Sequence, residues 1–147
     1  MKPDDLKNRT KQFALRILKL VAALPNNLAG RTIGGQLARA GTSVGSNYRA
    51  ACRGRSKAEF IAKLGIVEEE ADESAFWMEL IIESELLKKP LVEPLLIEAN
   101  ELAKIMASSR ISASAALKRN SNSQLAIGNR KSEIGNVLWL STKKDLS

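Results

Sequence analysis

The chain has 147 residues, 27% of them charged and 44% hydrophobic, which suits one soluble globular domain with a real core. Aromatic residues make up only 4%, which argues against a β-sandwich, and the single cysteine excludes an internal disulfide framework. The net charge of +7 divides into +9 over residues 1–60 (12 basic, 3 acidic), −7 over residues 61–107 (4 basic, 11 acidic) and +5 over residues 108–147 (7 basic, 2 acidic).

The first predicted helix begins at Asp4 and ends before Pro25. Asp4 and Asp5 can cap its N-terminus and oppose the helix dipole. Apolar residues then recur at helical steps along one face: Leu6, Phe13, Ile17, Leu20 and Leu24. The run Pro25-Asn26-Asn27 stops the helix.

The second predicted helix, Arg31 to Arg53, has four faces when its residues are placed at about 100° intervals. The apolar face forms a core stripe of Ile33, Leu37, Ala40, Val44, Tyr48 and Ala51. The basic face carries Arg31, Arg39, Arg49 and Arg53. The small face is made of Gly34, Ala38, Gly41 and Gly45, and the polar flank contains Gln36, Ser43 and Asn47.

The small face predicts a close contact with another helix, in the same chain or between subunits. Glycine inside a helix costs up to about 1 kcal/mol relative to alanine, so several glycines in one helix need an offsetting gain. Small residues provide that gain by allowing another backbone to approach closely. The alternative is that Gly34-Gly35 or Gly45 simply breaks the helix into shorter pieces.

A sharp turn is predicted after the second helix. Gly54 is suited to the left-handed conformation that ends a helix. The run Ser56-Lys57-Ala58-Glu59 reads as a capping box, in which Ser56 accepts from the Glu59 amide and Glu59 reaches back to the Ser56 amide. This signal starts a third helix.

Two further helices complete the predicted fold. The third runs from Ser56 to about Leu87, with a core line of Phe60, Leu64, Val67, Ala71, Ala75, Met78 and Ile82. The fourth begins near Pro94, or slightly before it, and continues to about Leu117, with a stripe of Val92, Leu95, Ala99, Leu102 and Met106.

Four amphipathic helices with short connections predict an all-α, up-down antiparallel four-helix bundle over residues 1–118. From Lys118 onward the apolar periodicity disappears and the composition becomes polar and basic. We therefore expect residues 119–147 to form a flexible basic tail.

The run RAGTSVGSN, followed by RGRSKAEFIAKL and an acidic helix, resembles the "four helix bundle protein" family encoded in intervening sequences of bacterial 23S ribosomal RNA genes. The accessory protein of diversity-generating retroelements is a related branch. The resemblance covers roughly residues 5–115. The matched positions are Gln36, Arg39, Ala40, Ser43, Val44 and Asn47, then Arg55, Ser56, Glu59 and Phe60.

The chain also departs from this family at one motif. Family members commonly have N-I-A-E-G where this chain has Asn47-Tyr48-Arg49-Ala50-Ala51, so any role of that glutamate is lost here. The resemblance implies a ring-shaped homo-oligomer, typically a pentamer, whose biochemical function is mostly uncharacterised. The retroelement branch implies a nucleic-acid-binding scaffold with a reverse transcriptase as its protein partner.

The basic residues lead to a first hypothesis, a scaffold that binds RNA or DNA phosphates without strong sequence specificity. Guanidinium groups suit phosphates because their donors form a fork that matches the phosphate oxygens. The candidate contacts are Arg31, Arg39, Arg49, Arg53, Arg55 and Lys57. The positive electrostatic field around them is increased by Lys7, Lys11 and Arg16. No RNP-type motif or zinc-ligand set supports base readout.

The acidic third helix leads to the alternative, a protein-interaction scaffold that binds no nucleic acid. In that case the basic helix pairs with the acids Glu68, Glu69, Glu70, Asp72 and Glu73, within or between subunits. The two hypotheses differ in whether the arginines face solvent or meet acids.

We expect no enzyme activity, no catalytic residues, no metal and no cofactor. The chain has no histidine, so it lacks the Glu-x-x-His motifs of di-iron bundles and an imidazole base for a nucleophile. Cys52, close to Arg49, Arg53 and Arg55, could be reactive, although a small spacer is the simpler interpretation. No apolar run reaches the roughly 18 residues of a membrane span, so we expect a cytoplasmic protein without membrane contact.

Overall fold

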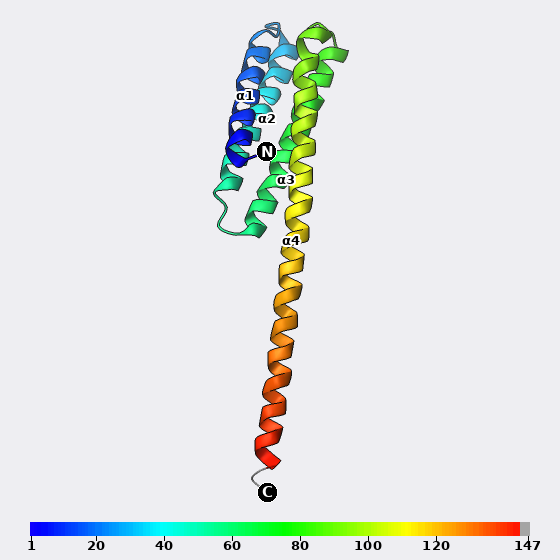
Figure 1. The fold of residues 1–147 in the computed structure, drawn as a ribbon. Helices are drawn as coiled ribbons and strands as arrows, with labels where there is room; N and C mark the ends of the chain where they lie inside the picture. The colour runs from blue at the N-terminus through cyan, green and yellow to red at the C-terminus, as the bar shows by residue number, and fades with distance from the viewer. Residues whose placement is uncertain (145–147) are drawn as a thin grey trace.

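Four helices pack side by side in the computed structural model, which describes residues 1–144 and the side chains of residues 1–138 (Figure 1). They are α1 (Pro3–Ala22), α2 (Leu28–Cys52), α3 (Lys57–Glu83) and α4 (Lys89–Lys144). Sequential helices run antiparallel, and α3 packs against both α2 and α4, while α1 packs mainly against α2. The predicted four-helix bundle is therefore confirmed.

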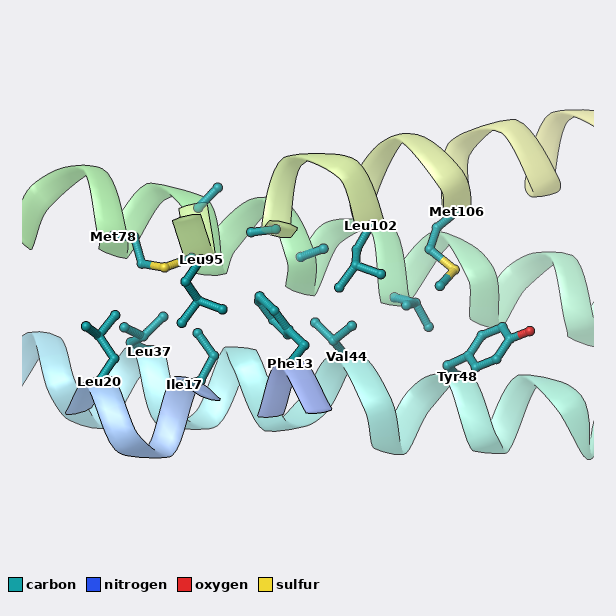
Figure 2. Packing of buried hydrophobic residues seen from close by; sticks show 14 of the residues in the cluster. Phe13, Ile17, Leu20, Leu37, Val44, Tyr48, Met78, Leu95, Leu102 and Met106 are labelled. Carbon is teal, nitrogen blue, oxygen red and sulfur yellow. The ribbon is translucent and has the colours of Figure 1, made fainter. Parts of the chain in front are cut away.

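The core consists mostly of aliphatic side chains, as the low aromatic content requires. Phe13, Ile17, Leu37 and Val44 from the first two helices meet Met78, Leu95, Leu102 and Met106 from the last two (Figure 2). The predicted stripes point inward, with one shift near the end of α3, where Ile81 is buried and Ile82 is only half-buried. Burying each such side chain stabilises the folded state by about 1.5–3 kcal/mol, so the apolar stripes favour the packing of the four helices.

The start of α2 lies three residues before the predicted position at Arg31. Asn27 is the N-cap, and its side-chain oxygen accepts a hydrogen bond from the Gly30 amide at 2.8 Å. A Cβ at Gly30 would lie 2.0 Å from the Pro25 carbonyl oxygen, so only glycine fits this tight turn. Asn27 was predicted only to stop the first helix, and it also starts the next one.

The end of α3 lies four residues before the predicted end at Leu87. Glu85 has a φ of 59°, and the Leu86 and Glu85 amides donate to the carbonyl oxygens of Ile81 and Ile82, both at 3.1 Å. This is the Schellman arrangement, which normally has glycine at the left-handed position. Because a glutamate occupies it here, no glycine marks this helix end in the sequence.

The last helix differs most from prediction. It begins at Lys89, contains Pro94 in an early turn and continues without interruption to Lys144, whereas the fourth helix was predicted to end at about Leu117. Residues 118–138 are exposed throughout, and Figure 1 shows this part of α4 extending beyond the bundle. Residues 145–147 of the predicted tail lie outside the described residues, and its flexibility stays a prediction.

Candidate nucleic-acid interface

The six candidate phosphate contacts fall into two groups with different surroundings. Arg39, halfway along α2, faces α3: its guanidinium lies 2.7 Å from a Glu73 carboxylate oxygen and 3.8 Å from one of Glu70. Arg31, near the start of α2, donates to the side-chain oxygen of Asn26 at 3.1 Å. Each of these two arginines therefore already has a hydrogen-bond or ion-pair partner within the chain.

The other four cations lie at the opposite end of α2, in the turn that follows and at the first residue of α3. Arg49, Arg53, Arg55 and Lys57 are exposed. Within the part of the chain whose side chains are described, none of these four side chains makes a hydrogen bond or ion pair. We call Arg49, Arg53, Arg55 and Lys57 the turn cluster. These four residues are the candidate phosphate contacts that remain open to a partner.

The turn between α2 and α3 fixes the backbone of the turn cluster. Ser56 is the N-cap of α3 and accepts from the Glu59 amide at 3.1 Å, as the capping box predicts. The reciprocal bond differs, because the Glu59 carboxylate accepts from the amide of Arg55 at 2.9 Å instead of that of Ser56. This bond ties the backbone of Arg55 to α3 while its guanidinium stays free.

Gly54 suits this turn for a reason other than the predicted one. No glycine among the described residues has a positive φ, so Gly54 is not left-handed. Instead, a Cβ at this position would lie 3.1 Å from the Ala51 carbonyl oxygen and 3.3 Å from the Phe60 amide nitrogen. The turn is thus closed by tight backbone approach at Gly54.

A groove of about 480 Å³ lies beside the turn cluster, where the first turns of α1 meet the α2–α3 turn. Its lining residues are Pro3, Lys7, Tyr48, Ala51, Cys52, Gly54, Arg55, Ser56, Lys57 and Phe60. Burial raises the pKa of Tyr48, and the neighbouring Cys52 adds to the effect. Several of these residues were predicted to contact phosphates, but the groove itself was not predicted.

The acidic residues of α3 engage partners away from the turn cluster. Glu68 accepts from Arg110 of α4 at 2.8 Å, which raises the pKa of that guanidinium, and Glu70 and Glu73 face Arg39. Glu69 and Asp72 are exposed and lie on the surface near Arg110. Of the six candidate phosphate contacts, only Arg39 therefore pairs with the acids of α3.

Across the seam between α1 and α4, Arg9 donates to both Glu98 and Glu101. The Glu98 carboxylate takes two bonds from the guanidinium, one of them at 3.1 Å, and a Glu101 oxygen lies 2.8 Å away. The hydrogen bond with Glu98 is the main cause that raises the pKa of Arg9. This pair was not predicted, because spacing along one chain does not show which side chains meet across two helices.

The small face of α2 packs against α1 in the same chain. A Cβ on Gly41 would lie 2.7 Å from Ile17 Cγ1, and one on Gly45 would lie 3.3 Å from the Thr10 carbonyl oxygen. Gly34 faces Leu24 and Val21 in the same way, and Ala38 is half-buried. The glycines do not break the helix, since α2 is continuous from Leu28 to Cys52.

Other predicted polar residues have local roles. Ser43 donates to the Arg39 carbonyl oxygen at 2.6 Å, and the Asn47 side chain donates to the Ser43 carbonyl oxygen at 2.9 Å. Gln36 is exposed.

Among the described residues, no group of three or more His, Cys, Asp or Glu side chains is placed to hold a metal ion. In that same part of the chain, no helix is both long and apolar enough to span a bilayer.

Comparisons with known proteins place this bundle in a family. Residues 4–108 match the family model described as 23S rRNA-intervening sequence protein. A search of curated proteins finds no match. A crystal structure of a protein of unknown function from the S23 ribosomal protein family of Bacteroides thetaiotaomicron is similar, with a TM-score of 0.69 and 34% identity over 75% of this chain and 98% of that one. The chain therefore belongs to the 23S rRNA-intervening sequence protein family.

Proposed function

We propose that this protein is a non-enzymatic, homo-oligomeric scaffold that binds the phosphates of nucleic acid through the turn cluster. The observation that carries the proposal is the contrast between Arg39 and the turn cluster. Arg39 is engaged by Glu70 and Glu73, whereas the four cations of the turn cluster face solvent without an acidic partner among the described side chains.

Binding of this kind is electrostatic and tolerant of sequence. Each neutralised phosphate releases counterions, so affinity falls steeply as salt rises. The exposed part of α4 carries four more cations and one acid up to residue 138, which extends the basic surface: Lys118, Arg119, Arg130, Lys131 and Glu133. Arginine in three of the four turn-cluster positions favours paired hydrogen bonds to phosphate oxygens.

Assembly into a ring, as the family resemblance implies, would repeat the turn cluster around an axis. Several weak phosphate contacts made at once raise the overall affinity by their effective concentration. A partner such as a reverse transcriptase belongs to the same proposal and rests on that resemblance alone. The protein-interaction alternative is favoured by one observation, the pairing of Arg39 with α3.

Charge reversal tests the proposal. We expect Arg49→Glu with Arg53→Glu to abolish binding of a fluorescent single-stranded oligonucleotide, measured by anisotropy at low salt, because repulsion replaces attraction at two phosphate contacts. The matched control is Lys19→Glu with Lys88→Glu, which makes the same charge change at two exposed residues at the other end of the bundle.

The control should retain most of the binding, and both variants should keep the wild-type circular dichroism spectrum. Equal losses in the two variants would mean that only net charge matters. Unchanged binding in the turn-cluster variant would overturn the assignment of the phosphate contacts.

A further inference from the structure

The groove beside the turn cluster combines two kinds of lining. Three cations reach it from two directions: Lys7 from α1, and Arg55 and Lys57 from the α2–α3 turn. None of its lining residues is acidic. The groove is thus complementary in charge to an anion that enters from the side of the turn cluster.

The rest of the lining is apolar and aromatic. Phe60 lies half-buried in the first turn of α3, and Ala51 and the buried Tyr48 come from the last turns of α2. Figure 2 shows the Tyr48 ring at the end of the core, next to Met106. A ligand that fills this groove therefore needs an apolar planar part as well as a negative charge.

Lys7 has one acidic neighbour, and that contact is weak. Its ammonium lies 3.6 Å from Asp4, whose side chain is 94% exposed. Exposed ion pairs of this kind contribute little, because water and salt screen them. Lys7 is therefore available to an incoming anion.

We infer that this groove binds one nucleotide of a single-stranded nucleic acid, with the base against Phe60 and the flanking phosphates at Arg55, Lys57 and Lys7. The inference rests on the proposed function and adds a specific site to it. The volume of about 480 Å³ lies within the range of about 300–1,000 Å³ typical of small-ligand sites. A paired base inside a duplex is not free to enter, so the site selects single strands.

The inference separates two contributions to binding. Phosphate contacts at the turn cluster act on any polyanion, whereas the groove acts only where a base is present. Base–aromatic contacts are sequence-tolerant, because every base has a π-face. We therefore expect a preference for strands with bases and little preference among the bases.

The first test compares a short oligothymidylate with an abasic oligonucleotide of the same length and phosphate number. Wild-type protein should bind the strand with bases about tenfold more tightly, in line with one base contact. Phe60→Leu should lose this preference while its affinity for the abasic strand stays unchanged. The matched control is Phe76→Leu on the same helix, because Phe76 is exposed and lies outside the groove lining.

The second test needs no substitution. Cys52 is the only cysteine of the chain and lines the groove, so its alkylation by a maleimide reports on groove occupancy. Saturating oligothymidylate should slow alkylation about tenfold, and the abasic strand should slow it much less.

The outcomes distinguish this inference from the proposed function. Equal affinity for both strands, or equal alkylation rates with either strand, would overturn the groove site and leave phosphate binding standing. Absence of binding by either strand at low salt would overturn both. A base preference that Phe60→Leu removes and Phe76→Leu retains, together with protection of Cys52, would establish the site.

Discussion

At the scale of single residues, Glu70 shows how burial and charge compete at the α2–α3 interface. One of its carboxylate oxygens is buried without a hydrogen-bond partner. Burial is the main cause that raises its pKa, the nearby charge of Glu73 adds to this, and Arg39 opposes it. Ionisation of Glu70 therefore costs more free energy in the folded protein than it would in water.

This shift predicts a pH dependence with a definite sign. A carboxyl whose pKa is higher in the folded state binds its proton more tightly there, so it stabilises the fold below its ordinary pKa and loses that contribution as pH rises through the raised value. We expect Glu70→Gln to increase the free energy of unfolding at pH 7 by about 0.5–1 kcal/mol, with a difference that shrinks as pH falls towards 4.

Urea denaturation at several pH values measures this effect, and Glu69→Gln is the control, because Glu69 is exposed on the neighbouring position. A Glu70→Gln variant less stable than wild type at pH 7 would show that attraction to Arg39 exceeds the cost of burial.

At the scale of the helices, the contact between α1 and α2 depends on the small face. Gly41 leaves no room for a Cβ, because Ile17 is fully buried and its branched side chain lies 2.7 Å from the Cβ position. Gly35 lies on the same helix with nothing within 4 Å. The two glycines therefore form a matched pair in different surroundings.

Replacing each by alanine should shift stability in opposite directions. Gly41→Ala should lower the free energy of unfolding by about 1–3 kcal/mol through overpacking. Gly35→Ala should raise it by about 0.5–1 kcal/mol, because alanine has the higher helix propensity. Thermal unfolding measures both changes. Equal changes in the two variants would mean that α1 and α2 do not approach as closely as described.

The fold was largely predictable because each helix has its own apolar stripe. Phe13, Ile17, Leu37 and Leu102 could be assigned to the core from spacing alone, since burial of one helical face leaves a periodic pattern. The helix ends were less predictable: Glu85 adopts the left-handed conformation without being glycine, and Asn27 both follows one helix and caps the next.

The extension of α4 was missed because no packed face marks it in the sequence. Residues 118–138 bury nothing in the bundle, so their apolar residues need not follow a stripe.

The candidate site was predicted only in part for a related reason. Spacing placed Arg39 and Arg49 on the same face of α2. Only the packing of α3 shows that Glu73 contacts Arg39 and not Arg49.

At the scale of the whole molecule, the charges separate by position. The acids of α3 and α4 meet arginines along the bundle, as in the pairs Glu68–Arg110 and Glu98–Arg9. The turn cluster lies at the end of the bundle beyond which α4 extends, and that extension is itself basic (Figure 1). This arrangement places the turn cluster and the basic extension of α4 at the same end of the bundle.

The salt dependence of binding tests the phosphate contacts most directly. The slope of the logarithm of the binding constant against the logarithm of salt concentration counts the neutralised phosphates. We expect a steep negative slope for wild-type protein with a single-stranded oligonucleotide, and a slope smaller by about one to two for Arg49→Ala with Arg53→Ala. The same slope in both proteins would contradict the claim that the turn cluster contacts phosphates.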